Sequence, residues 1–179
     1  MRTHAITAIA RACRAAAFAT AIALAAGAAH GAEAVLAAPQ SHVGAQTFDP
    51  SRDAARDVAD AVALAKASGR RVLVDVGGEW CVWCHLLDHF FATDGEALRL
   101  RKRYYVVVKV NWSPDNHNDA VLSRWPPVAG YPHLFVLDAD GRLVHSQPTD
   151  VLEKGRGYDR DRIIAFLRRY APMTVTTPG

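Results

Sequence analysis

Cysteine is scarce in this chain, with three among 179 residues, and Cys13 lies near the N-terminus. Acidic residues are absent before Glu33, whereas three arginines give the same segment a positive charge. The Ala-rich apolar run that follows, at residues 15–29, is shorter than the about 20 residues that a transmembrane helix needs. These features predict a secretory signal peptide at residues 1–31 that is cleaved after Gly31, with an uncleaved N-terminal anchor as the alternative.

The rest of the chain has no excess of either charge sign. Residues 32–179 carry 18 basic and 18 acidic side chains, because the three arginines of the signal segment account for the whole formal charge of +3. The pI therefore gives no reason to expect a nucleic-acid partner. The length fits a single domain, which we place at residues 51–171, after a flexible leader at 32–50 and before a frayed tail at 172–179.

Helical and strand patterns alternate along this domain. Apolar residues recur at helical spacing after Ser51, which we expect to be an N-cap, and Gly69 supplies a stop. The later elements are expected to be a strand at 72–76, a helical region at 86–100 with a break near Asp94, a strand at 104–112, a loop at 113–127 with a short helix, a hairpin at 134–146 and a helix at 159–170.

This order of elements predicts the fold class. Strands that alternate with helices indicate parallel pairing, and the final hairpin adds an antiparallel strand. We therefore expect an α/β fold with a central mixed four-stranded sheet flanked by helices.

Two cysteines remain after the signal segment, and both lie in the motif Cys81-Val-Trp-Cys84-His85. This motif is compatible with attachment of a c-type haem, with half of a metal site, or with a redox dithiol. A disulfide between the two cysteines would close a very short loop and would stabilise the fold little, because loop-closure entropy grows with loop length. Reversible redox chemistry therefore explains the pair better than a structural disulfide does.

The haem and metal alternatives each lack part of what they require. Small c-type cytochromes are mostly helical and often use Met as the second axial ligand, whereas this chain has strands and, after the signal segment, a single methionine at Met173. A zinc or copper site needs further ligands, and no second C-x-x-C motif is present. The four nearby Cys and His side chains, from Cys81 to His89, lie on one expected helix, which cannot easily surround a tetrahedral ion. We therefore expect no cofactor and no metal.

In the redox interpretation, each cysteine carries out one step of disulfide exchange. Cys81 follows the first expected strand closely and would begin a helix, where first-turn amide groups and the helix dipole favour the thiolate that attacks disulfides. Cys84 lies three residues later on the same helix face and would resolve the mixed disulfide. The pair would thus cycle between a dithiol and a Cys81–Cys84 redox disulfide.

The residues around this motif resemble those of thioredoxins. The segment "VLVDVGGEWCVWC" is similar to their strand and active-site turn, with Trp80 directly before the first cysteine. The segments "VVKVN" and "VAGYPHLFVLDADGRLV" are similar to the next strand and to the part that carries a cis-proline. The resemblance covers roughly residues 51–170 and is nearest to exported thioredoxin-like domains, including those of transmembrane disulfide reductases. It implies a thioredoxin-like fold and thiol–disulfide exchange.

The resemblance also implies a buried acid near the cysteines. Asp75 occupies the position of the family's buried carboxylate, and Lys109 occupies that of a lysine that neighbours it. Burial would raise the pKa of Asp75, so that this residue could accept the proton of Cys84 during resolution. The alternative for Asp75 is a strand-end carboxylate that faces solvent.

The remaining implied site residues surround the cysteine pair. Pro132 lies at the cis-proline position, where the Tyr131 backbone would pair with an extended substrate segment, although an ordinary trans bond is the alternative. We expect Trp80 to pack on the turn and shield the sulfur, and Trp83 to be an exposed apolar surface for the substrate. His85 is expected to be partly exposed in the first helical turn and to tune Cys81 modestly.

Together these observations predict a periplasmic thiol–disulfide oxidoreductase that acts on protein disulfides. The dipeptide between the cysteines is Val-Trp rather than the Gly-Pro of thioredoxin, and the overall pattern favours a reductase or isomerase over an oxidase. No nucleotide-binding motif is present, so electrons would come from another protein, such as a membrane or periplasmic relay. We expect a monomer that binds no nucleic acid, in which the long loop 113–127 influences the choice of partner.

Overall fold

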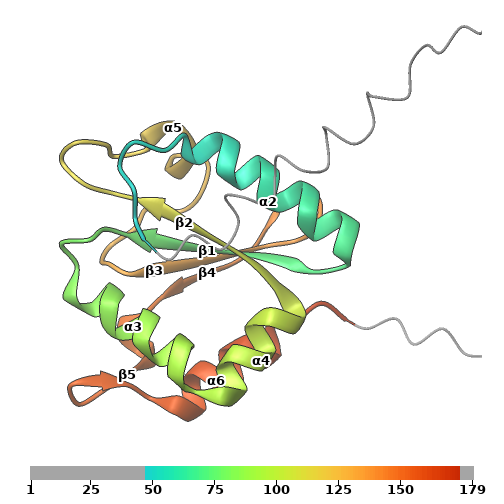
Figure 1. Cartoon of the computed structure of the whole chain (residues 1–179), viewed down its shortest axis with the longest axis vertical. Helices are drawn as coiled ribbons and strands as arrows, with labels where there is room; N and C mark the ends of the chain where they lie inside the picture. The colour runs from blue at the N-terminus through green and yellow to red at the C-terminus, as the bar shows by residue number, and fades with distance from the viewer. Residues whose placement is uncertain (1–46, 174–179) are drawn as a thin grey trace, which may run out of the picture.

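The computed structural model describes residues 47–173, which fold as a sheet between two layers of helices (Figure 1). The predicted signal peptide, residues 32–46 of the predicted leader and the last six residues of the predicted tail lie outside the described residues. Within 47–173, no helix combines the length and the apolar character that crossing a membrane requires.

The central sheet contains four strands in the order β2-β1-β3-β4. β1 (Arg71–Gly77) pairs in parallel with β2 (Tyr105–Asn111), and its other edge pairs with the antiparallel β3 (His133–Leu137). β4 (Leu143–Pro148) pairs with β3 as an antiparallel edge strand. The predicted α/β fold with a mixed four-stranded sheet is therefore confirmed.

Helices cover both faces of this sheet (Figure 1). One face carries α2 (Ala54–Ser68) and the short α5 (Asp119–Leu122). The other face carries α3 (Val82–Thr93), α4 (Gly95–Tyr104) and α6 (Arg160–Arg169).

Two aspartates decide where helices begin. Asp94 separates α3 from α4, as predicted, because its carboxylate accepts two amide N–H groups of the first turn of α4. α2 begins after Asp53, and the expectation that Ser51 caps it is wrong. The Asp53 carboxylate accepts the amide of Arg56 at 3.1 Å, whereas the Ser51 hydroxyl donates to Asp49. Both residue types are good caps, so composition alone does not choose between them.

The sequence pattern does not predict the segment between β4 and α6. A 3-10 helix (Asp150–Leu152) leads there into a hairpin of β5 (Glu153–Lys154) and β6 (Gly157–Tyr158). Strands of two residues are too short to show an alternating pattern. The hairpin nevertheless matters to the site, because the Tyr158 hydroxyl donates to the carbonyl of Trp83 on α3 at 3.2 Å.

Side chains alternate between the two faces of β1 and divide the interior into two cores. Three valines of β1 pack with α2 in the first core. Leu73 points to the opposite face and packs in the second core, with residues of α3, α4 and α6. Asp75 and Gly77 share the face of Leu73, and Asp75 is only 4% exposed. This register buries the carboxylate beneath α3 and rules out the solvent-facing alternative.

Phe48 extends the folded domain beyond its predicted start. The ring is 1% exposed and packs against Cys81 and Cys84, although residues 32–50 are expected to form a flexible leader. The backbone N–H of Phe48 donates to the Glu79 side chain at 2.6 Å, which ties this segment to the turn before Cys81. A single aromatic residue in a polar stretch has no periodicity, so the sequence does not reveal its burial.

The hydroxyl of Tyr105 provides a test of how the two layers are joined. Burial raises the pKa of Tyr105, so the hydroxyl stays protonated and donates to the Leu167 carbonyl of α6 at 2.8 Å. We expect Tyr105→Phe to lower the free energy of unfolding by about 1 to 2 kcal/mol, because a buried carbonyl loses its partner. Urea unfolding measures this change. Tyr104→Phe is the matched control, since Tyr104 is only half-buried and its hydroxyl has no hydrogen-bond partner among residues 47–173. An equal loss in both variants would contradict the role of the hydrogen bond.

Candidate active site

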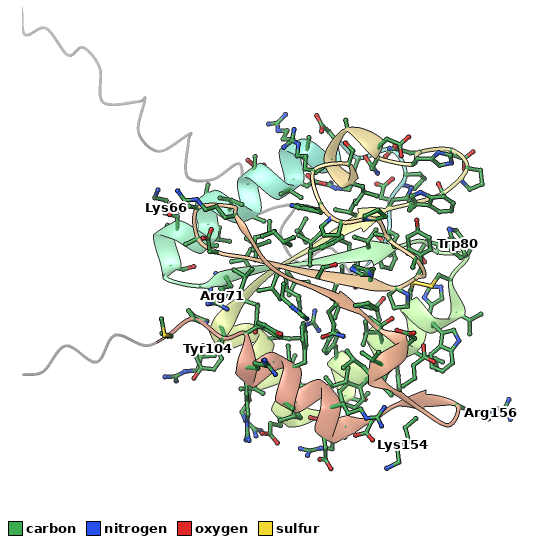
Figure 2. All side chains as sticks on the ribbon, turned by 180° about the vertical axis from the view of Figure 1, so that it is seen from behind. Lys66, Arg71, Trp80, Tyr104, Lys154 and Arg156 are labelled. Atoms are coloured by element: carbon green, nitrogen blue, oxygen red, sulfur yellow. A yellow bond between two sulfur atoms is a disulfide. The ribbon has the colours of Figure 1, made fainter. Side chains whose placement is uncertain are left out.

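Cys81 and Cys84 are joined by a disulfide at the N-terminus of α3, just after the turn that follows β1 (Figure 2). Cys81 is the N-cap residue and has an extended backbone, with φ −92° and ψ 102°. Its sulfur accepts the amide N–H of Cys84 at 3.1 Å. A thiolate on Cys81 would receive the same hydrogen bond and the favourable field of the helix N-terminus.

The sheet approaches the disulfide closely at Gly77, the last residue of β1. A Cβ atom on Gly77 would lie 2.5 Å from the Cys84 sulfur and 3.0 Å from the Phe48 ring. Any larger residue would therefore push Cys84 out of its place. Cys84 is 1% exposed and Cys81 is 4% exposed, so Cys81 is the cysteine that a partner reaches more easily.

A buried lysine bridges two carboxylates beneath α3. The Lys109 ammonium lies 2.7 Å from both oxygens of Asp88 and 3.3 Å from one oxygen of Asp75. The register of β1 and β2 places Asp75 directly opposite Lys109, whereas Asp88 comes from α3. Sequence reasoning missed Asp88, although a spacing of four residues puts it on the same helix face as Cys84.

Burial raises the pKa of Asp75, because desolvation of its carboxylate outweighs the attraction of Lys109. The negative charge of Asp88 raises this pKa further. The Oδ1 atom of Asp75 has no hydrogen-bond partner among the side chains and backbone of residues 47–173. Both observations favour the protonated form of the Asp75 carboxyl group over its usual ionised form.

The two tryptophans beside the cysteines follow the expectations only in part. Trp80 packs on the turn as expected, because its indole lies over Gly78 and its N–H donates to the Trp112 carbonyl at 2.9 Å, although the residue is 53% exposed. Trp83 is half-buried, and its ring packs edge-on against Tyr158 with centroids 5.6 Å apart. The exposed apolar side chain on the first turn of α3 is Val82, at 70% exposure. The expectation of an exposed Trp83 is wrong because the β5–β6 hairpin covers it.

The loop before β3 lies beside the disulfide. The peptide bond between Tyr131 and Pro132 is cis. Tyr131 packs against the cluster of Phe48, Cys81 and Cys84, and its ring lies 5.6 Å from that of Trp80. The Thr149 hydroxyl donates to the Pro132 carbonyl at 2.6 Å and fixes the loop against the end of β4.

A small hollow opens next to this loop. Its volume is about 160 Å³. It is lined by residues 129–132 of the loop, residues 148–150 and Glu153. The loop and the exposed Trp80 and Val82 together frame the approach to Cys81.

His85 and the loop 113–127 complete the surroundings. His85 is exposed, and its Nε2 donates to the carbonyl of Glu79 at 2.8 Å, which braces the turn before Cys81. The start of the long loop is ordered by side-chain amides, including one from Asn118 to the Asn111 carbonyl at 2.7 Å. This order stacks the ring of His117 on that of Trp112 at 4.9 Å.

The haem and metal alternatives gain no support from the site or the fold. Within residues 47–173 there is no group of three or more His, Cys, Asp or Glu side chains arranged to hold a metal ion. The pair that either alternative would use is bonded in a disulfide at the start of a helix, within a mixed sheet. The arrangement instead matches what dithiol–disulfide exchange needs.

Comparison with known proteins gives a consistent result. Residues 53–139 match the model of the family described as thioredoxin-like. Two curated relatives, both named thiol:disulfide interchange protein DsbD, are 29% identical over 114 residues in Ralstonia nicotianae and 29% identical over 86 residues in Citrobacter koseri. These matches cover 63% and 48% of this chain but 17% and 14% of the relatives, so the chain spans less than a fifth of their length.

A solved structure shows the same architecture. The disulphide isomerase from Xylella fastidiosa Temecula1 aligns with a TM-score of 0.60 and 23% identity, over 68% of this chain and 94% of that chain. Similarity at this level of identity supports the fold alone. The matched region, the fold and the cysteine pair agree, so residues 53–139 form a thioredoxin-like domain that carries the cysteine pair of a thiol–disulfide oxidoreductase.

Proposed function

We propose that this protein exchanges disulfides with protein substrates, with Cys81 as the attacking thiolate and Cys84 as the resolving thiol. The observation that carries the proposal is the disulfide at the N-terminus of α3, whose more accessible cysteine caps the helix. The helix end favours a thiolate on Cys81 after reduction, and the thiolate is the form that attacks a disulfide.

The reducing direction proceeds in two steps. The Cys81 thiolate attacks one sulfur of a substrate disulfide, and the other substrate sulfur leaves as a thiolate. Cys84 then loses its proton and attacks the Cys81 sulfur, which forms the Cys81–Cys84 disulfide and releases the second substrate thiolate. Two electrons thus pass from the protein to the substrate.

We assign to Asp75 the acceptance of the Cys84 proton. A carboxylate with a raised pKa is a better base toward a thiol than an ordinary one. The Cys84 sulfur lies against Gly77, two residues beyond Asp75 on the same face of β1, so the sulfur and the carboxylate lie over the same part of the strand. Lys109 and Asp88 act as positioning residues, because they hold the carboxylate and set its charge environment.

We assign substrate binding to the surface that frames Cys81. The backbone of Tyr131 and Pro132 would pair with an extended substrate segment. Trp80 and Val82 would contact its apolar side chains, because both are exposed beside the disulfide. His85 supports the turn, and Trp83 supports the packing of α3.

We further infer a reductase or isomerase in the periplasm, rather than an oxidase. The names of the curated relatives, thiol:disulfide interchange proteins, support exchange with protein partners. In this scheme the Cys81–Cys84 disulfide is reduced by a membrane or periplasmic relay protein, and the monomer uses neither a cofactor nor nucleic acid.

Removal of the resolving cysteine tests the assigned roles. We expect Cys84→Ser to accumulate mixed disulfides between Cys81 and substrate proteins that persist for minutes to hours, because the internal attack that releases them is lost. Non-reducing electrophoresis of periplasmic extract measures these complexes. Cys81→Ser is the matched control and should trap far fewer partners. If the two variants trap partners equally, or neither does, the order of attack is wrong.

Asp75→Asn tests the buried acid through the stability of the disulfide form. Because the folded pKa of Asp75 is raised above its ordinary value of 3.8, its contribution to stability is present below that value and is lost as the pH rises through the folded pKa. We expect Asp75→Asn to remove this decline, worth about 1.4 kcal/mol for each unit by which the pKa is raised. Unfolding free energies measured across this pH range give the difference.

Two further measurements separate the assigned catalytic role from a structural one. Asp88→Asn keeps the Asp75 carboxyl but removes a negative charge that raises its pKa, so the decline in stability with pH should become smaller without disappearing. Asp75→Asn should also slow the release of mixed disulfides about a hundredfold, as expected for loss of a general base. Unchanged release with altered stability would leave Asp75 a structural residue only.

A redox titration tests the direction of electron flow. The protein is equilibrated with glutathione buffers and followed by tryptophan fluorescence, since Trp80 and Trp83 flank the disulfide. A midpoint near about −270 mV is expected for a reductant, whereas one near about −120 mV would identify an oxidant. An absorbance scan of the same sample completes the test, because a Soret band without titratable thiols would replace the proposal with the haem alternative.

A further inference from the structure

Exposed positive side chains gather at the end of the sheet that lies farthest from the disulfide. β1 and β2 are parallel, and β1 runs from Arg71 toward the turn that carries the cysteines. Figure 2 accordingly shows Arg71 and Tyr104 well away from Trp80, which lies beside the disulfide. We use the term cationic end for the exposed set Arg99, Lys102, Arg103, Arg168 and Arg169.

The contacts show that these cations form one surface. Arg99, Arg103 and Arg168 line the same hollow, which lies between α4 and α6. Arg99, Lys102 and Arg103 are spaced at i, i+3 and i+4, so they share one face of α4. The Arg71 guanidinium donates to the Tyr170 carbonyl at 2.8 Å and joins the end of α6 to the start of β1.

Helix stability accounts for only part of this charge. Cations in the last turn of a helix offset its dipole, and both α4 and α6 end in such residues. The cationic end carries more positive charge than the neighbouring carboxylates neutralise. Among residues 47–173, Glu96 is the single carboxylate in a salt bridge with the set, and it contacts Arg168 while also binding Arg160.

We propose that the cationic end binds the anionic phospholipid headgroups of a bilayer and holds the domain with its disulfide facing away from the membrane. The surface has the composition of membrane interfaces, because half-buried Tyr104 and Tyr170 accompany the arginines and Met173 is 89% exposed beside them. The expected export of the chain favours a lipid partner over nucleic acid. The proposal does not depend on the redox function, since the two surfaces lie at opposite ends.

Vesicle binding tests this surface directly. The sheet and both cores lie within residues 47–173, so the chain from Ala32 onward keeps its folded domain and lacks the apolar signal segment, which would bind lipid by itself. We expect this chain to sediment with phosphatidylcholine vesicles that contain phosphatidylglycerol, and not with vesicles of phosphatidylcholine alone. Binding should weaken as salt is raised.

Charge-removing variants show whether position or net charge matters. We expect the triple variant Arg99→Gln, Lys102→Gln, Arg103→Gln to bind about a hundredfold more weakly. The matched control is Arg124→Gln, Arg142→Gln, Arg156→Gln, which removes the same charge from exposed residues elsewhere and should bind as the original protein does. Absence of vesicle binding, or an equal loss in both triple variants, would overturn the proposal.

Fluorescence quenching by brominated lipids tests the orientation. Trp80, Trp83 and Trp112 surround the disulfide, so their emission should stay unquenched when the cationic end touches the bilayer. Strong quenching would mean that the disulfide end docks instead and would overturn the proposed orientation. Duplex DNA that binds as tightly as the anionic vesicles would replace the lipid partner with a general polyanion.

Discussion

The contact between the Cys84 sulfur and the backbone of β1 at Gly77 is the constraint on which the site depends. Only a glycine leaves room for that sulfur, and the fit places α3 so that Cys81 becomes its N-cap. The strand register then determines the rest, because Asp75 lies two residues back on the same face and Lys109 lies opposite it. One close approach thus brings together the helix end, the cysteine pair and the buried acid.

The buried acid lowers the stability of the fold, a cost that the proposed proton transfer by Asp75 would explain. The Lys109 ammonium contacts both oxygens of Asp88 more closely than it contacts Asp75. Asp75 therefore shares this positive charge with Asp88. One oxygen of Asp75 is left without a partner among the described residues. A protein selected for stability alone would favour an apolar side chain at such a position. Raised pKa values that arise from burial beside specific charges occur most often at functional sites, and the nearby cysteine pair is the reason that we propose for Asp75.

Features that depend on local pattern could be read from the sequence, and features that depend on packing between distant segments could not. The four strands, the break at Asp94 and the position of Cys81 at a helix start each follow from residue types within one short segment. Phe48 has no such pattern, and only its contact with the cysteines reveals its role. The exposure expected for Trp83 is wrong for the same reason, since the hairpin that covers it has strands too short to predict.

The parallel pairing of β1 and β2 also places an apolar surface and a positive surface at opposite ends of the sheet. Both strands end near the disulfide, where apolar Trp80 and Val82 are exposed. Both strands begin where α4 and α6 end, so the basic residues that stabilise those helix termini gather there. The same topology therefore places the proposed substrate surface at one end and a positive surface at the other. Electrostatic docking at the positive surface would leave the redox site free, because the length of the sheet lies between them.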